Sequence, residues 1–173
     1  NVKRLRPVEL GPFDYENAPV TTGLWVGEGL TSYFGDLLAA RAGLGSPADY
    51  LAVCSRHITD LQTRQPGRLV QTLEQSSSQM FERLPADRKV DYYVKGPVVG
   101  LVLDARIRRL TNGRKSLDDV MRLENERWSG AHGYTAAQFN QTVSDAAGVD
   151  VGDLLPSLIA TTDQLDYTER LDW

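Results

Sequence analysis

The sequence predicts an all-α fold, arranged as a helical bundle. Apolar residues recur at helical spacing along most of the chain, and no stretch alternates with period two for long enough to form a strand. Helix-capping sequences also follow one another with short connections between them. The chain has 173 residues, 41% of them apolar and 24% charged, which suits one globular domain with a sizeable core. We therefore expect a single helical unit over residues 1–173, with helices from residue 21 onward.

The chain should open with an extended lead-in over residues 1–20, because this stretch contains three prolines. The first helix is expected to begin near Thr21 or Thr22, whose hydroxyls can cap its first N–H groups. It should end near Gly43 or Gly45, since glycine is the usual residue just after a helix.

Three helices are expected in the middle of the chain. Ser46 followed by a proline marks the start of a helix that should run to about Gln65. A shorter helix is expected from Thr72 to Leu84, where the next proline breaks it. A third should run from Pro97 to Leu110, with proline again at the first helical position.

The last third of the chain carries further capping signals. Capping boxes predict helices over residues 116–128 and 135–147, the second of them closed by Gly148. Asp150 should then cap a last substantial helix, and residues 165–171 should form a final turn.

One carboxylate, Glu28, stands between two glycines inside the apolar pattern of the first helix. Each glycine costs a helix interior roughly 1 kcal/mol relative to alanine, so helix propensity does not explain the pair. Glycines in such a place indicate a close approach by a neighbouring helix or by a ligand. Glu28 therefore either meets a cation or is a solvated surface acid.

The charge distribution argues against some kinds of partner. The net charge of −4 disfavours nucleic acid. A basic stretch over residues 106–115 and an acidic one over 145–172 are expected to be solvated faces. The longest apolar run, residues 98–103, is far too short to cross a bilayer.

The chain has one cysteine, Cys54, so no internal disulfide can form. Its apolar neighbours predict a buried and unreactive thiol. A nucleophile built from Cys54 and His57 fits the spacing but has no supporting signature. His57 and His132 do not belong to an HxxxH pair, and both are expected to be surface or packing residues rather than metal ligands.

Several motifs together resemble a known family. The sequence reads N-V-K-R-L-R-P over residues 1–7, L-G-P-F-D-Y over 10–15, W-V-G-E-G-L-T-S-Y over 25–33 and Y-V-K-G over 93–96. The chain is similar in these stretches, and in others almost to its end, to the glycyl aminopeptidases. These are gluzincin zinc metallopeptidases, in which an HExxH helix runs almost directly into such a sequence. The resemblance implies the C-terminal helical part of a catalytic domain.

The resemblance also implies roles for individual residues. Glu28 would be the third zinc ligand, and Tyr93 would donate a hydrogen bond to the substrate carbonyl, with Tyr92 as the alternative. Lys95 is expected to serve packing or a structural ion pair. Asp36, two turns after Glu28, could accept a hydrogen bond from a zinc-binding histidine, or it is a solvated acid.

The HExxH helix that supplies both histidines and the general base should lie immediately before Asn1. We therefore expect the chain to be a piece of a longer peptidase, inactive by itself and without tightly bound zinc. The intact protein would act on peptides with N-terminal Gly or Ala, and a PDZ-like domain could follow Trp173. The alternative is a non-catalytic helical interaction module, which a degenerate HExxH sequence would indicate.

Overall fold

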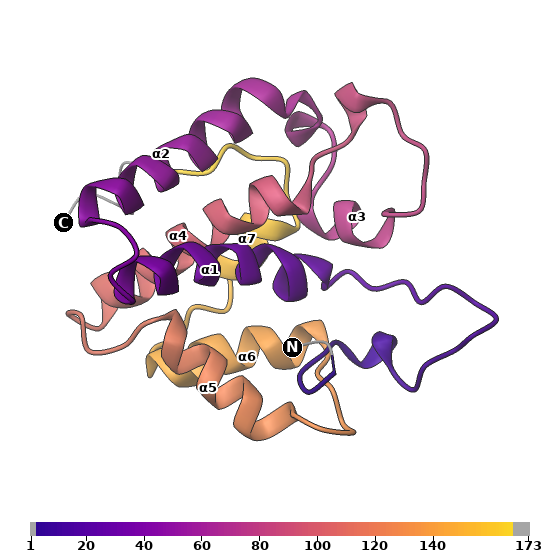
Figure 1. Cartoon of the computed structure of the whole chain (residues 1–173). Helices are drawn as coiled ribbons and strands as arrows, with labels where there is room; N and C mark the ends of the chain where they lie inside the picture. The colour runs from indigo at the N-terminus through magenta and orange to yellow at the C-terminus, as the bar shows by residue number, and fades with distance from the viewer. Residues whose placement is uncertain (1–2, 168–173) are drawn as a thin grey trace.

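The computed structural model describes residues 3–167, and within them every regular element is a helix (Figure 1). The predicted all-α class is therefore confirmed. The elements are η1 (Val8–Leu10), η2 (Trp25–Leu30), α1 (Thr31–Arg41), α2 (Pro47–Arg64), η3 (Pro66–Leu69), α3 (Leu73–Ser78), η4 (Ala86–Arg88), α4 (Tyr92–Leu110), α5 (Leu117–Trp128), α6 (Ala136–Ala147) and α7 (Leu154–Ile159).

Several helix boundaries lie where the sequence predicts them, namely those marked by a capping box or by a closing glycine. Ser46 and Thr135 each form a capping box with the residue three positions later, at the starts of α2 and α6. The N–H of Ser116 donates to the carboxylate of Asp119 at 2.9 Å, at the start of α5. Gly148 closes α6 in the left-handed conformation, with φ of 68°.

Two other helix boundaries were predicted wrongly. The helix expected to start at Pro97 begins five residues earlier, because the carboxylate of Asp91 accepts the N–H of Tyr93 at 2.8 Å and caps α4. Pro97 therefore lies inside the helix, where it removes one intrahelical hydrogen bond. The helix expected to run to Leu84 ends at Ser78 instead.

Two residues that were expected to cap helices close turns instead. Asp150 accepts the N–H of Gly152 at 2.8 Å and so closes a turn, whereas α7 begins later, after Asp153. Thr21 likewise accepts the N–H of Gly23 at 3.1 Å rather than capping the first helix. Of the expected final turn, residues 165–167 are not helical, and residues 168–171 lie outside the described part of the chain.

The first helix has a feature that the sequence did not predict. Trp25–Leu30, the segment that contains Glu28, is a π-helix, which continues directly into α1. Single π-turns are rare and occur frequently at functional sites.

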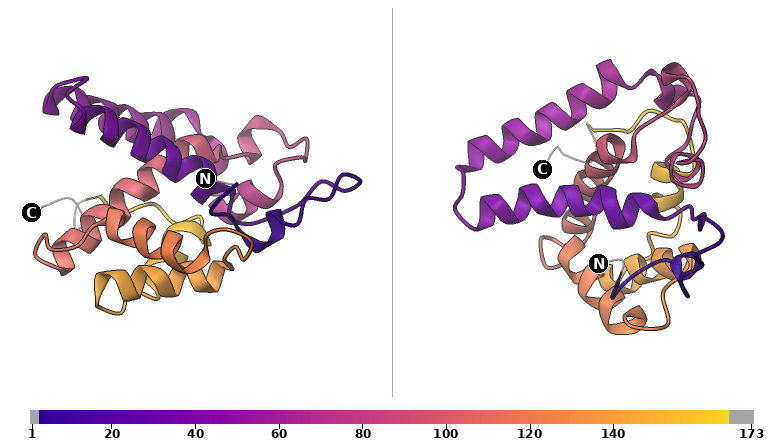
Figure 2. Two further views of the ribbon diagram at one scale, coloured as in Figure 1. Left: turned by 60° about the horizontal axis from the view of Figure 1, so that its bottom comes forward. Right: turned by 45° about the vertical axis from the view of Figure 1, so that its right-hand side comes forward.

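Helix α4 lies at the centre of the molecule (Figure 2). Eleven of its residues are buried, and it contacts η2, α1, α2, α3, α5 and α7. Helices α5 and α6 pack together below it, and the lead-in runs past their ends. The lead-in is fixed there by a backbone hydrogen bond in each direction between its Arg6 to Val8 segment and Tyr134, both at 2.9 Å.

A buried carboxylate joins these helices. Asp104 on α4 accepts hydrogen bonds from the hydroxyl of Tyr33 at 2.9 Å, from Nε of Arg108 at 2.8 Å and from the backbone N–H of Leu117 at 2.6 Å. It thereby links α1, α4 and the start of α5. Among residues 3–167, no helix is both long and apolar enough to span a membrane.

Candidate active site

Helices η2 and α4 touch through their backbones at two glycines. A Cβ atom added to Gly96 would lie 2.6 Å from the Cα of Gly29, and one added to Gly29 would lie 2.8 Å from the Cα of Gly96. Side chains do not fit at such distances. The expectation that a neighbouring helix approaches the glycine pair closely is therefore confirmed at Gly29.

This crossing brings Glu28 and Tyr93 together. The hydroxyl of Tyr93, in the first turn of α4, donates a hydrogen bond of 2.6 Å to Oε2 of Glu28. Glu28 is half-buried and the side chain of Tyr93 is 46% exposed, so solvent or a ligand can reach the pair.

The contact sets the protonation of the phenol. The hydrogen bond to Glu28 raises the pKa of Tyr93 to about 12, and partial burial adds to the effect. Tyr93 is therefore protonated at neutral pH and can act as a hydrogen-bond donor. Tyr92 packs instead against the core, with its ring 4.9 Å from that of Tyr93. Of the two tyrosines, Tyr93 is the one that forms a hydrogen bond with Glu28.

Asp36, which its position two turns after Glu28 left open between a contact with a zinc-binding histidine and a solvated acid, contacts a histidine of this chain. Its Oδ2 lies 2.8 Å from Nε2 of His57, and this pair joins α1 to α2. His57 is partly buried in this contact, as expected for a packing histidine. A role for Asp36 beside a zinc-binding histidine stays a prediction.

Lys95 lies two residues after Tyr93 and is only 2% exposed. Its Nζ donates to the carbonyl of Thr161 at 3.4 Å, so it connects α4 to the segment after α7. Burial lowers the pKa of Lys95 to about 8, although the nearby carboxylate of Asp163 opposes this shift. These contacts agree with the packing role expected from the sequence.

Cys54 is half-buried, less covered than the sequence suggested. Burial raises the pKa of its thiol, which lowers the fraction of nucleophilic thiolate. His57 is engaged with Asp36, so the arrangement gives no support to a Cys54–His57 nucleophile.

A family model described as M61 glycyl aminopeptidase matches residues 1–99, a stretch that contains both Glu28 and Tyr93. The chain belongs to this family. The family assignment made from the sequence motifs is therefore confirmed.

A solved structure supports the assignment. The chain is similar to an aminopeptidase N family protein from Idiomarina loihiensis, with a TM-score of 0.89 and 25% sequence identity over 99% of this chain. The chain spans only 30% of the length of that protein. No curated protein matches the chain.

The M61 resemblance implies a zinc ion, and the described residues fit only part of such a site. Glu28 offers one accessible carboxylate, but between residues 3 and 167 no three His, Cys, Asp or Glu side chains are grouped to hold a metal. A catalytic zinc usually takes three protein ligands. The described residues therefore fit one ligand position, and the expected absence of tight zinc binding by this chain stays a prediction.

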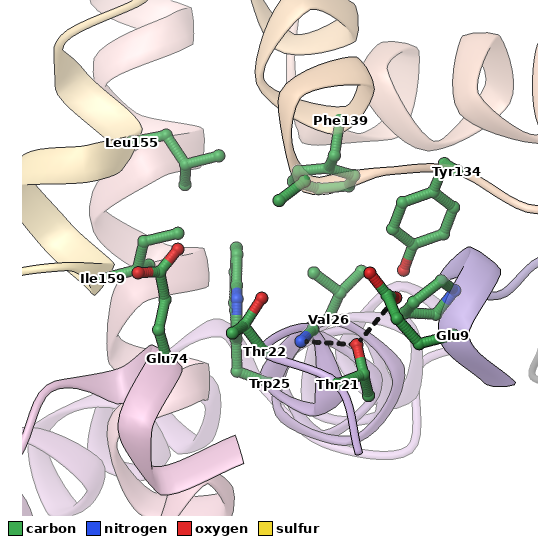
Figure 3. A pocket seen from close by; sticks show the side chains of 13 residues that line it. Glu9, Thr21, Thr22, Trp25, Val26, Glu74, Tyr134, Phe139, Leu155 and Ile159 are labelled. Atoms are coloured by element: carbon green, nitrogen blue, oxygen red, sulfur yellow. Dashed lines mark hydrogen bonds between the residues drawn. The ribbon is translucent and has the colours of Figure 1, made fainter. Parts of the chain in front are cut away.

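The sequence reasoning missed a pocket lined by Trp25, Tyr134 and Phe139 (Figure 3). These aromatic residues come from separate segments: Trp25 and Phe139 each fit an apolar helical pattern, and Tyr134 lies just before a helix. Only the carboxylates near them, Glu9 and Glu74, could have given a signal, and nothing in their spacing links them.

Proposed function

We propose that this chain is the helical part of the catalytic domain of a zinc-dependent aminopeptidase, with Glu28 and Tyr93 in its active site. The observation that carries the proposal is the hydrogen bond between these two side chains, which are 65 residues apart in the chain. The family resemblance assigned both residues to one site, and the fold makes them neighbours. Following the family, the substrates are peptides with N-terminal Gly or Ala.

Tyr93 would stabilise charge that develops during the reaction. Hydrolysis of a peptide bond places negative charge on the carbonyl oxygen, and a positioned donor lowers the barrier by binding that oxygen. The phenol suits this task because the ordinary pKa of tyrosine, about 10, keeps the proton in place at neutral pH. Its exposure leaves room for the substrate. Because the phenol has a single proton, its hydrogen bond to Glu28 would have to be exchanged for one to the carbonyl oxygen when the substrate binds.

Glu28 would hold the metal. Its carboxylate is held at a backbone crossing where neither helix can shift freely, which gives a ligand a fixed position. Zinc, when bound, would polarise the substrate carbonyl and lower the pKa of a water molecule. The two histidines and the general base would come from an HExxH helix upstream of this chain, so we expect the chain alone to be inactive.

The proposal is tested in a longer protein that includes the upstream helix. Changing Glu28 to Gln should greatly lower the zinc content, measured by atomic emission on purified protein. Changing Tyr93 to Phe should leave zinc in place and lower kcat for a glycyl substrate by roughly 10²–10³-fold, the loss expected for one oxyanion donor. The matched controls are Glu16 to Gln, an exposed acid in the lead-in, and Tyr92 to Phe.

The outcomes separate the roles. Normal zinc content in the Glu28 variant would remove this residue from the ligand set. A near-normal rate for Tyr93 to Phe would move the donor role to Tyr92 or to another group. Absence of both zinc and peptidase activity in the unaltered longer protein would favour the non-catalytic interaction module.

A further inference from the structure

Helix α3 touches both of the helices that carry the Glu28–Tyr93 pair. It contacts η2, which contains Glu28, and α4, which begins with the turn of Tyr93. Two adjacent serines of α3, Ser76 and Ser77, are each only 1% exposed. Because buried polar groups are nearly always hydrogen-bonded, their hydroxyls have to find partners inside the protein. Each hydroxyl binds the backbone of a different helix of the site.

Ser77 holds the start of η2. Its hydroxyl oxygen accepts the backbone N–H of Trp25, three residues before Glu28, at 3.2 Å. The same hydroxyl donates to the carbonyl of Leu73, one turn back in α3, at 3.1 Å, and this second bond fixes its orientation. An N–H in the first turn of a helix has no partner within that helix, so Ser77 supplies the acceptor that Trp25 lacks.

Ser76 holds the residue that leads into α4. Its hydroxyl donates to the carbonyl of Val90, three residues before Tyr93. The backbone N–H of Val90 donates to Oε1 of Gln71, just before α3, at 2.8 Å. Val90 is fully buried, so side chains of residues 71–76 bind both of its backbone polar groups where water does not reach them.

These bonds attach both helices of the site to one support. The contact between Gly29 and Gly96 fixes how closely η2 and α4 approach. Two glycines have no side chains that interlock, so their contact by itself does not prevent one helix from sliding or rotating against the other. Ser76 and Ser77 supply the further attachments. The hydrogen bond of the active-site pair is 2.6 Å long and is lost beyond about 3.5 Å, so a movement of about 1 Å breaks it.

We propose that Ser76 and Ser77 are positioning residues, which hold the two side chains of the proposed active site in register. The inference rests on the proposed function for the identity of that site, whereas the positioning itself is a property of this chain. Loss of either hydroxyl would leave a buried backbone group of Trp25 or Val90 without a partner. The helix end would then move to regain one, and the site residue three positions later would move with it.

The first test uses the 173-residue chain with carbon-13 at Cζ of its tyrosines, because the NMR chemical shift of this atom reports the hydrogen bond of the phenol. The signal of Tyr93 is assigned from its loss in Tyr93→Phe. The variant Glu28→Ala gives the position of this signal without the hydrogen bond. At neutral pH, Ser76→Ala and Ser77→Ala should each move the signal toward that position.

Ser78→Ala is the matched control. Ser78 follows the two positioning residues on the same helix, and its hydroxyl donates within α3, to the carbonyl of Gln75 at 3.3 Å. The Tyr93 signal should therefore stay in place in this variant. Should the alanine variants fail to fold, Ser77→Cys is measured instead, because a thiol has a similar shape and is a weaker acceptor for the N–H of Trp25.

The second test uses the longer protein that includes the upstream helix. Ser76→Ala and Ser77→Ala should each lower kcat for a glycyl peptide by roughly 10–100-fold, the loss expected when a group outside the site misplaces it by about 1 Å. Ser78→Ala should leave kcat unchanged. Both readouts differ from a measurement of stability, which any buried serine would affect.

The outcomes separate this inference from the proposed function. An unmoved Tyr93 signal in folded Ser76 and Ser77 variants would overturn it, and so would an equal movement in Ser78→Ala. A normal kcat in both variants, beside a large loss in Tyr93→Phe, would also overturn it. If Tyr93→Phe has a normal rate while the signal moves as expected, the proposed function fails and the positioning of the pair stands.

Discussion

Glu124 on α5 makes the stability of this protein depend on pH. Its side chain is fully buried against α6, and neither carboxylate oxygen has a hydrogen-bond partner within the described structure. The hydroxyl of Thr142 donates to the carbonyl of Gln138 at 2.8 Å and not to Glu124. Burial raises the pKa of Glu124 from 4.5 to about 7, although the charge of Arg127 opposes the shift. The folded state therefore retains a proton that the unfolded state has lost between these two pH values.

The sign and size of the effect follow from this difference. Because the folded state binds more protons between pH 4.5 and about 7, the free energy of unfolding falls as the pH rises through that window. The loss is complete above the folded pKa and amounts to about 3 kcal/mol, since each pKa unit corresponds to about 1.4 kcal/mol. Glutamine at position 124 has a similar shape and no charge, so it should remove this loss.

Glu124 to Gln should therefore match the unaltered protein at pH 4 and be up to about 3 kcal/mol more stable at pH 8. Urea unfolding followed by circular dichroism at both pH values measures the difference. Glu126 to Gln, two positions along the same helix and exposed, should change stability little at either pH. An equal effect of the Glu124 change at pH 4 and pH 8 would refute the reasoning, because it would show that the carboxyl does not titrate in that window.

Two further substitutions test the packing that positions the site. Gly96 to Ala should destabilise the fold by about 1–3 kcal/mol because its Cβ would collide with Gly29, whereas Gly35 to Ala, with nothing within 4 Å of the added atom, should stabilise it by about 0.5–1 kcal/mol. Equal effects of these two changes in urea unfolding would show that the helix crossing is not tight. Asp104 to Asn places an amide before three hydrogen-bond donors and should cost about 2–4 kcal/mol. A change below about 0.5 kcal/mol in the same assay would mean that this carboxylate does not join the helices.

The parts of the fold that could be predicted from the sequence are those fixed by neighbouring residues. The capping boxes at Ser46 and Thr135 work over three residues, so their sequence alone defines them. The roles of Pro97 and Asp150 were predicted wrongly because the same local sequence is compatible with two structures at each residue. Proline can start a helix or lie within one, and aspartate can cap a helix or close a turn.

The candidate site could be predicted only in part. The residues by themselves left Glu28 open between a cation ligand and a solvated acid, and the family resemblance supplied Tyr93. The glycine pair did predict a close approach by another helix. Glycine destabilises a helix interior, so two glycines there indicate that a larger side chain would not fit. The π-helix and the partner of Asp36 could not be predicted, since both depend on how distant segments pack.

Gly29 and Gly96 lower the stability of their helices, but they allow η2 and α4 to cross closely enough for Glu28 and Tyr93 to meet. The hydrogen bond between Tyr93 and Glu28 is 2.6 Å long, and such a bond is lost once the separation exceeds about 3.5 Å. A methyl group at Gly29 or Gly96 would force the two backbones apart by an amount of that order. A stable helix with alanine at these positions could therefore not hold both side chains within reach of one ligand. The glycines therefore lower local helix stability at a crossing where the proposed active site needs close contact.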